Sequence, residues 1–272
     1  MPNPEQALND ALAAHDPVAA LAAAEQATRA QPAAARPRIA LFQLMCILGQ
    51  WKRAMNQLEV IGQLDAQALS MVSTYREAIK CEAVRAKVFA GTTTPLAFGE
   101  PQPWLAWLVE ALQQEAGGNA SAAADLRARA FEEAAFPSGT ANEQPFDWIA
   151  DSDPRLGPVL EAIVNGKYYW MPLAALAQVD IDPPEDLRDM VWTAAHFVFV
   201  NGGESVGLIP TRYPGSEASA DGAISLARKT VWDSGPAGSV AGSGQRIFAT
   251  DDREIALLDL RQLIIQPSAS AA

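Results

Sequence analysis

The segment "GQWKRAMNQLEVIGQLDA", from Gly49 to Ala66, indicates the architecture of the first half of the chain because it repeats an earlier segment. The earlier copy, "HDPVAALAAAEQATRAQP", runs from His15 to Pro32 and starts 34 residues before it. Helix pairs of the tetratricopeptide type recur with a period of about 34 residues. The spacing therefore predicts tetratricopeptide-like helical hairpin repeats.

The two copies also agree position by position in the kind of residue that helix packing requires. Ala20 aligns with Ala54, and a small residue there lets two helices cross closely. The copies differ at their last position, where Ala66 replaces Pro32. The other aligned pairs are Pro17 with Trp51, Ala24 with Leu58, and Ala27 with Ile61. This register predicts helices at 4–14, 18–30, 37–48 and 51–62.

Further helical segments extend the stack. Apolar residues recur at helical spacing in "DAQALSMVSTYREAIKCEAVRAKVFAG", and Gly91 at its end is a typical helix stop. The Pro- and Gly-rich "GTTTPLAFGEPQP" that follows predicts an irregular connection. A last hairpin is predicted from Pro103 onward, turning at Gly117-Gly118. A helical domain is therefore expected over 1–136.

Beyond a polar linker predicted at 137–145, the composition changes to short β-branched and aromatic runs separated by turn residues. This alternation predicts a compact, mostly antiparallel β domain over 146–266, followed by a disordered tail at 267–272. One segment, "RLGPVLEAIVNG", is predicted as a short helix closed by Asn165-Gly166. The runs that predict strands are "KYYWMP", "LAQVDID", "AHFVFVN", "SVGLIP", "SLARKTVW", "QRIFATD" and "EIALLDLRQLII". The fold class is α+β.

Composition limits the kinds of partner. The 272 residues carry a net charge of −12, which argues against non-specific binding to nucleic acid or anionic lipid, because both need clustered Lys and Arg. The start, "MPNPEQALNDALAAHDP", has neither the basic nor the apolar region of a signal peptide, and no later run is long enough to span a membrane. We expect a cytoplasmic protein.

The cysteines and histidines are too few to build a metal centre. Cys46 and Cys81 lie in helical patterns and are predicted as buried apolar residues. His15 occupies the turn position that Gly49 fills in the next repeat, and His196 is expected on a strand, half-buried. We therefore predict no metal and no cofactor.

The nucleophile and carboxylate patterns also favour structural roles. Ser216 in "PGSEA" lacks the G-x-S-x-G elbow of serine hydrolases, and Pro214-Gly215 fits a type II turn that Arg212 and Glu217 flank and close by pairing. The run "SGPAGSVAGSGQR" predicts a hairpin loop. "IADSDPRLG" and "DIDPPEDLRD" are interpreted as turn and cap residues. A metal-dependent or serine hydrolase remains the alternative, using Asp151, Asp153, Arg212, Ser216 and Glu217.

Several strings, in order along the chain, resemble the ImpE family, also called TagJ, accessory proteins of bacterial type VI secretion. They are "LFQLMCILGQWKRAMNQL", "MVSTYREAIKCEAVRAKVFAG", "FGEPQPWLAWLVEAL", "PFDWIADSDPRLGPVLEAIVNGKYYWMP" and "GLIPTRYPGSEAS". The resemblance implies a non-enzymatic cytoplasmic adaptor. It implies binding to the N-terminal helix of the small contractile-sheath subunit, and through it an influence on sheath recycling by the ClpV unfoldase.

The resemblance assigns no binding residues, so the candidates come from the sequence. A groove for an amphipathic helix needs aromatic and aliphatic anchors with charges at its rim. The candidates are Trp148, Tyr168, Tyr169, Trp170, Arg212 and Tyr213. A permanent structural subunit of a larger assembly is the remaining alternative, and the sequence leaves the oligomeric state and the binding face open.

Overall fold

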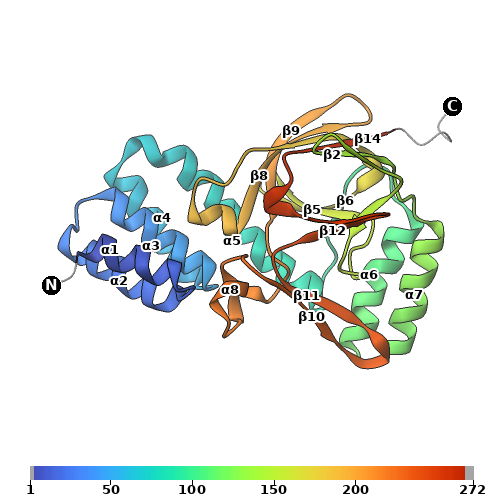
Figure 1. The fold of residues 1–272 in the computed structure, drawn as a ribbon, viewed down its shortest axis with the longest axis horizontal. Coiled ribbons are helices and arrows are strands. Elements are labelled where there is room, and N and C mark those ends of the chain that lie inside the picture. Colours follow the sequence, from blue (N-terminus) through green and yellow to red (C-terminus); the bar gives the residue numbers. More distant parts are fainter. Residues whose placement is uncertain (1–2, 267–272) are drawn as a thin grey trace.

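The computed structural model describes residues 3–266 as a β half with helices on two sides (Figure 1). The tail predicted at 267–272 lies outside the described residues. In Figure 1, α1 to α4 lie at one end, α5 runs toward the sheet, and the α6–α7 hairpin lies at the other end. The α-helices are α1 (Pro4–Ala13), α2 (Pro17–Ala30), α3 (Ala35–Ile47), α4 (Trp51–Leu64), α5 (Leu69–Phe89), α6 (Pro103–Ala116), α7 (Ala120–Glu133) and α8 (Gly222–Ser225).

The helical repeats form where the sequence predicts them, within a few residues. Asp16 caps α2 by accepting hydrogen bonds from the amides of Val18 and Ala19, and proline at the first helical position of α2 loses no helical hydrogen bond. His15 (φ 56°) and Gly49 (φ 63°) are both left-handed and occupy the same place in their repeats. His15 is thus a turn residue, as predicted.

Ala20 and Ala54, the aligned small residues, are both fully buried at the helix crossings. The α6–α7 hairpin is confirmed as well.

The connection between α5 and α6 is not wholly irregular, contrary to the prediction. Leu96 and Ala97 form β1, which pairs in parallel with β6 (Lys167–Pro172), and the amide of Phe98 donates to the carbonyl of Trp170 at 3.1 Å. The three residues between Pro95 and Gly99 include no proline, so each has a backbone amide that can donate to a neighbouring strand. The exposed edge of β6 therefore acquires a short partner strand.

The β half contains a long, mostly antiparallel sheet with the strand order β1-β6-β5-β9-β8-β7-β14-β2-β3. A second sheet has the order β13-β12-β4, and β10 and β11 form a separate hairpin. The strands of these two sheets and of the hairpin are β1 (Leu96–Ala97), β2 (Gly139–Ala141), β3 (Gln144–Phe146), β4 (Ile149–Asp151), β5 (Val159–Val164), β6 (Lys167–Pro172), β7 (Leu176–Ile181), β8 (Trp192–Phe199), β9 (Glu204–Pro210), β10 (Thr230–Ser234), β11 (Val240–Gly244), β12 (Ile247–Thr250), β13 (Glu254–Ala256) and β14 (Gln262–Ile265).

Short 3-10 turns connect several of these elements. They are η1 (Ala66–Ala68), η2 (Leu173–Ala175), η3 (Leu187–Met190), η4 (Ser216–Ala218), η5 (Pro236–Gly238) and η6 (Leu257–Asp259). The last part of the predicted acidic turn, "DIDPPEDLRD", leads into η3, where Asp186 and Asp189 form a capping box, as the interpretation of that run expects.

The helix predicted for "RLGPVLEAIVNG" is wrong. Its centre is β5, a strand whose residues are all buried, and Asn165 (φ 49°) with Gly166 (φ 69°) turns the chain into β6. A strand covered on both faces shows no alternation, so periodicity cannot distinguish it from a buried helix segment. The Asn-Gly pair is the stronger signal, because a type I′ hairpin turn requires positive φ at both of its central positions.

The segment predicted as a linker, 137–145, also contains regular structure. It holds β2 and the first part of β3, joined by Asn142 and Glu143, which both have positive φ. Short strands near a sheet edge often have the same polar, Pro- and Gly-containing composition as linkers. Composition alone therefore does not separate the two.

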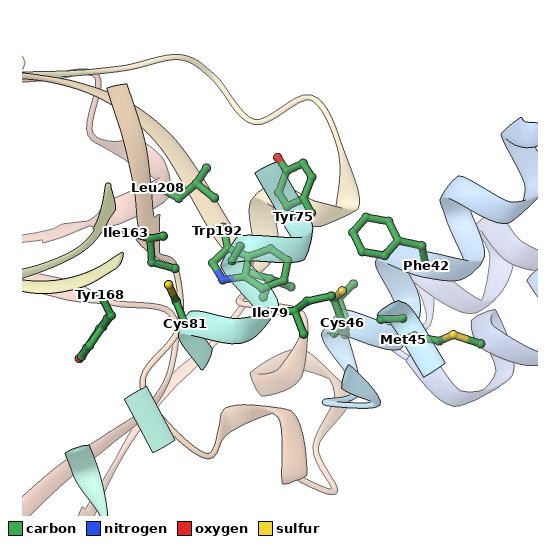
Figure 2. Close-up of a cluster of buried hydrophobic side chains, with 14 of the residues drawn as sticks. Phe42, Met45, Cys46, Tyr75, Ile79, Cys81, Ile163, Tyr168, Trp192 and Leu208 are labelled. Atoms are coloured by element: carbon green, nitrogen blue, oxygen red, sulfur yellow. The ribbon is translucent and has the colours of Figure 1, made fainter. Parts of the chain in front are cut away.

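One hydrophobic cluster joins the helical and β halves (Figure 2). The ring of Tyr75 on α5 lies 5.8 Å from the ring of Phe42 on α3 and 5.6 Å from that of Trp192 on β8, centroid to centroid. Cys46 and Cys81 are buried in this cluster, as predicted, and burial raises the pKa of both thiols. Aromatic contacts of this kind fix the helical stack against the sheet.

Candidate functional site

A network of buried charges lies where α5 meets the sheets. Arg85 on α5 makes a two-point ion pair with Glu161 on β5, with N–O distances of 2.7 and 3.0 Å. Arg246, directly before β12, pairs with Glu161 and also with Asp151 on β4. All four residues are buried. Paired in this way, the charges avoid most of the cost of isolated charges in an interior.

Aromatic donors complete the network. Tyr168 donates to Glu161, and the indole nitrogen of Trp170 donates to the Tyr168 hydroxyl at 2.8 Å. Tyr213 donates to Asp151 at 2.8 Å. On the other side of Arg85, the indole nitrogen of Trp192 donates to Glu82 at 2.9 Å. The carboxylates therefore have hydrogen-bond donors in addition to the arginines.

The carboxylates of the network differ in the direction in which their pKa values are shifted. Burial opposes ionisation of Glu161, but the guanidinium groups of Arg85 and Arg246 outweigh it and lower the pKa of Glu161 to about 2. For Asp151 burial dominates over Arg246 and raises the pKa to about 6. Burial also raises the pKa of Glu82.

Arg212 caps a helix of the other half. Its guanidinium donates to the carbonyl of Ile47 at 2.8 Å, to that of Cys46 at 3.4 Å, and to that of Ser225. Cys46 and Ile47 are the last residues of α3, where free carbonyls and the negative end of the helix dipole favour a cation. Burial lowers the pKa of Arg212 to about 10. The carbonyl of Arg212 accepts from Arg85 at 2.7 Å, which links this cap to the charge network.

The turn after Arg212 has the predicted type but not the predicted ion pair. Gly215 has φ 86° and ψ −8°, and the amide of Ser216 donates to the carbonyl of Tyr213 at 3.3 Å, as in a type II turn. The expected pairing of Arg212 with Glu217 is wrong, since no ion pair joins them within 3–266. Burial directs Arg212 to the carbonyls of α3 instead.

The same segment packs against both repeat turns. A Cβ at Gly49 would lie 2.6 Å from Cγ of Glu217, and a Cβ at Gly222 would collide with the carbonyl of His15. Each of these glycines permits an approach that a side chain would block. The segment from Arg212 to Gly222 thus fastens the helical repeats to the β half.

Four of the six predicted partner-binding residues lie in the interior. Tyr168, Trp170, Arg212 and Tyr213 are buried, and the contacts described above bring them together around the charge network. Tyr168 and Trp170 are two apart on β6 and therefore point to the same face, while Tyr169 points to the opposite one. Their surfaces are occupied by the protein's own core.

The other two keep accessible surface and lie outside the network. Trp148 is 38% exposed between β3 and β4. Tyr169 is partly buried, and its ring makes an edge contact with Phe98 at 6.0 Å between centroids. The structure therefore does not unite the six residues in one surface, and binding by Trp148 and Tyr169 stays a prediction.

The residues of the hydrolase alternative are used in internal bonds. Asp153 is fully buried and accepts from the side chain of Arg155 and from the amide of Gly242. The hydroxyl of Ser216, also fully buried, donates to the carbonyl of Tyr213 at 2.6 Å and accepts from the amide of Gly244 at 2.8 Å. Of the five residues of that set, Asp151, Asp153, Arg212 and Ser216 are buried and Glu217 is half-buried, so the one candidate nucleophile, Ser216, does not face solvent.

Residues 3–266 contain neither a cluster of metal-ligating side chains nor a membrane-spanning helix. No group of three or more His, Cys, Asp or Glu side chains in that range is arranged to hold a metal ion. No helix in the same range combines the length and apolar character needed to cross a bilayer.

Sequence reasoning missed Glu82, Arg85, Glu161 and Arg246. A charged residue inside an apolar run is the signal that was available: Glu161 lies in "VLEAIV" and Arg246 precedes "IFAT". Such a charge in a buried strand needs a partner of opposite sign. Which partner it finds depends on the packing of α5, β4 and β5.

An accessible apolar groove runs along α6, with a volume of about 420 Å³. We call it the α6 groove. Its far wall is the segment 94–102, which carries β1, and polar side chains such as Glu110 and Gln113 lie at its rim. Its apolar lining is Pro95, Ala97, Pro101, Leu105, Ala106 and Val109.

Comparison with known proteins gives three findings. The family model described as "ImpE protein" matches residues 143–264. A protein of Pseudomonas aeruginosa, "Type VI secretion system accessory component TagJ", is 49% identical over 250 residues, which cover 92% of this chain and 87% of that protein. The crystal structure of a Vibrio parahaemolyticus protein is similar with a TM-score of 0.87 at 24% identity, covering 96% of this chain and 98% of that one. The last likeness supports the fold.

Proposed function

This chain belongs to the ImpE family, as its sequence motifs predict, and we propose that it works as an accessory protein of a bacterial type VI secretion system. The observation that carries this proposal is the near full-length likeness to a protein named for that role. We further propose that it acts as an adaptor rather than an enzyme, which is consistent with the internal use of Asp151, Asp153 and Ser216.

The partner we propose is the N-terminal helix of the small contractile-sheath subunit, with a consequent effect on sheath recycling by the ClpV unfoldase. The α6 groove supports a helical partner, because amphipathic helices bind by laying their apolar face into such a groove. Leu105 and Val109 are one helical turn apart on its wall, which suits the i, i+4 spacing of anchors on a bound helix. Trp148 and Tyr169 remain separate candidates for contact with the subunit.

Titration calorimetry with the N-terminal peptide of the sheath subunit tests this proposal. Ala106 is exposed on the groove wall, so Ala106→Arg fills the groove without disturbing the core. Ala124→Arg adds the same side chain to an exposed position of α7 and serves as the control. We expect the wild type and the control to bind the peptide and Ala106→Arg to lose most of its affinity.

Each outcome distinguishes a part of the proposal. No binding by the wild-type protein at tens of micromolar refutes the sheath subunit as the partner. Equal binding by all three proteins refutes the α6 groove as the site while leaving the partner in place. Trp148→Ala and Tyr169→Ala are then measured in the same way.

A further inference from the structure

One region of the helical half has a charge opposite to that of the protein. The chain as a whole has a net charge of −12, yet residues 26–58 contain no Asp or Glu. The cations in that span are Arg29, Arg36, Arg38, Lys52 and Arg53. Salt screens exposed charges that lie more than about a Debye length apart. A partner close to this region therefore responds to its local positive charge more than to the net charge of the whole protein.

Three of these arginines converge on one pocket of about 420 Å³. Arg29 comes from α2, Arg38 from α3 and Arg53 from α4, so three different helices supply them. The side chains of Arg29 and Arg53 are 74% and 52% exposed. Buried Leu41 and Met45 of α3 also line this pocket, which we call the arginine pocket, and give it an apolar floor.

The arginine pocket holds more positive than negative charge. Glu25 is the carboxylate in its lining, and it accepts from Arg29 at 3.0 Å and from Arg53 at 2.6 Å. Arg38 donates instead to neutral oxygens, the carbonyl of Pro32 and the side-chain amide of Gln57. Three guanidinium groups thus share one carboxylate, and Arg38 is oriented without one.

We propose that the arginine pocket binds a short acidic segment of a partner protein. Carboxylates are the groups that arginine recognises with two parallel hydrogen bonds. The excess of two positive charges fits two carboxylates, and the apolar floor fits one aliphatic side chain between them. A nucleic acid fits less well, since the overall negative charge of the protein repels a long polyanion.

This site is separate from the α6 groove. The arginine pocket lies on α2 to α4 and the groove on α6, at opposite ends of the molecule (Figure 1). A failure of the sheath-peptide experiment therefore does not decide this proposal, and the reverse also holds. Both surfaces can be occupied at the same time.

Fluorescence anisotropy with two labelled hexapeptides tests the inference on the full chain. The acidic probe is Glu-Glu-Leu-Glu-Glu-Leu, and the neutral probe has glutamine in place of every glutamate. We expect the acidic probe to bind at low salt, the neutral probe to bind at least about tenfold more weakly, and acidic binding to weaken as salt rises. Absence of acidic binding, or equal binding of both probes, overturns the proposal.

Charge-matched variants locate the site. Arg38→Gln and Arg29→Gln each remove one cation from the pocket, and Arg76→Gln removes one from an exposed position of α5. We expect each pocket variant to weaken binding about tenfold and the control to bind like the wild type. Arg29 is highly exposed, so its substitution tests the site even if Arg38→Gln fails to fold.

Two results would contradict the arginine pocket as the binding site or an acidic peptide as its ligand. Equal weakening by Arg76→Gln shows that net charge alone attracts the probe. Tighter binding of a single-stranded hexanucleotide than of the acidic peptide, lost in the same variants, assigns the pocket to nucleic acid instead.

Discussion

The charge network predicts that Glu161→Gln is strongly destabilising. Glu161 holds Arg85, Arg246 and Tyr168 in the interior, so removal of its charge leaves two buried guanidinium groups without their shared partner. Removing one member of a buried ion pair costs about 3–5 kcal/mol of the free energy of unfolding.

A second route gives a similar magnitude. The pKa of Glu161 falls from its usual 4.5 to about 2, which corresponds to about 3 kcal/mol in favour of the ionised form in the folded state. Because the folded pKa lies below the unfolded one, this stabilisation is present above pH 4.5 and is lost as the pH falls through about 2. The direction of this pKa shift and the buried ion pair thus both predict a loss of a few kcal/mol.

Denaturant unfolding at pH 7, followed by tryptophan fluorescence, measures the effect. Trp170 and Trp192 both hydrogen-bond to members of the network, so the signal reports on its surroundings. Glu59→Gln is the matched control, since Glu59 is exposed on α4 and its substitution is expected to cost less than about 0.5 kcal/mol.

A loss of less than about 1 kcal/mol for Glu161→Gln would contradict a role for Glu161 in neutralising buried cations, because ordinary surface substitutions have effects of that size. The double variant Arg85→Gln with Glu161→Gln adds a further check. We expect it to lose less than the sum of the two single variants, since each single change leaves the other residue unpaired.

Three further predictions concern the same junction. Burial raises the folded pKa of Asp151 to about 6, above its usual 3.8. Its contribution to stability is therefore present below pH 3.8 and is lost as the pH rises through about 6. The free energy of unfolding of Asp151→Asn, measured from pH 4 to 7, should lack that decline. Gly49→Ala should cost about 1 kcal/mol more than Gly118→Ala in thermal unfolding, because both glycines have positive φ but only a Cβ at Gly49 meets Glu217. Arg212→Met should leave the Ile47 carbonyl at the end of α3 without its donor, lower stability by about 2 kcal/mol and speed amide exchange at the end of that helix. Unchanged exchange there would contradict the capping role.

The family signature "IPTRYPGSEAS" contains one feature of the candidate site that the sequence predicts and one that it does not. The type II turn at Pro214-Gly215 was predictable because the two residues impose their own backbone angles. The partners of Arg212 at the end of α3 were not predictable, since two of the three carbonyls it binds belong to residues 165 and 166 positions earlier. The expected pairing with nearby Glu217 was the local solution, and burial selected the distant one.

The interior placement of Tyr168 and Trp170 was within reach of the sequence. Residues two apart on a strand share a face, so the alternation in "KYYWMP" assigns them together and separates Tyr169. The role of this face is set by Glu161, which lies on a strand that was predicted as a short helix closed by Asn165-Gly166. Because this strand was predicted as a helix, the ion pair between Glu161 and Arg85 was not predicted.

The helical repeats, the turn at His15 and the family follow from the amino-acid sequence alone. The 34-residue period and the family strings are read in order along the chain, and the Asp16-Pro17 cap and the left-handed turn residue act within one helical turn. Packing in three dimensions, in contrast, makes β5 a strand, pairs the predicted linker into the sheet, and brings Arg85, Glu161, Arg246 and Asp151 together. The physical reason is burial: a charge in an interior must find a partner wherever packing places one, and no local pattern specifies that distance along the chain.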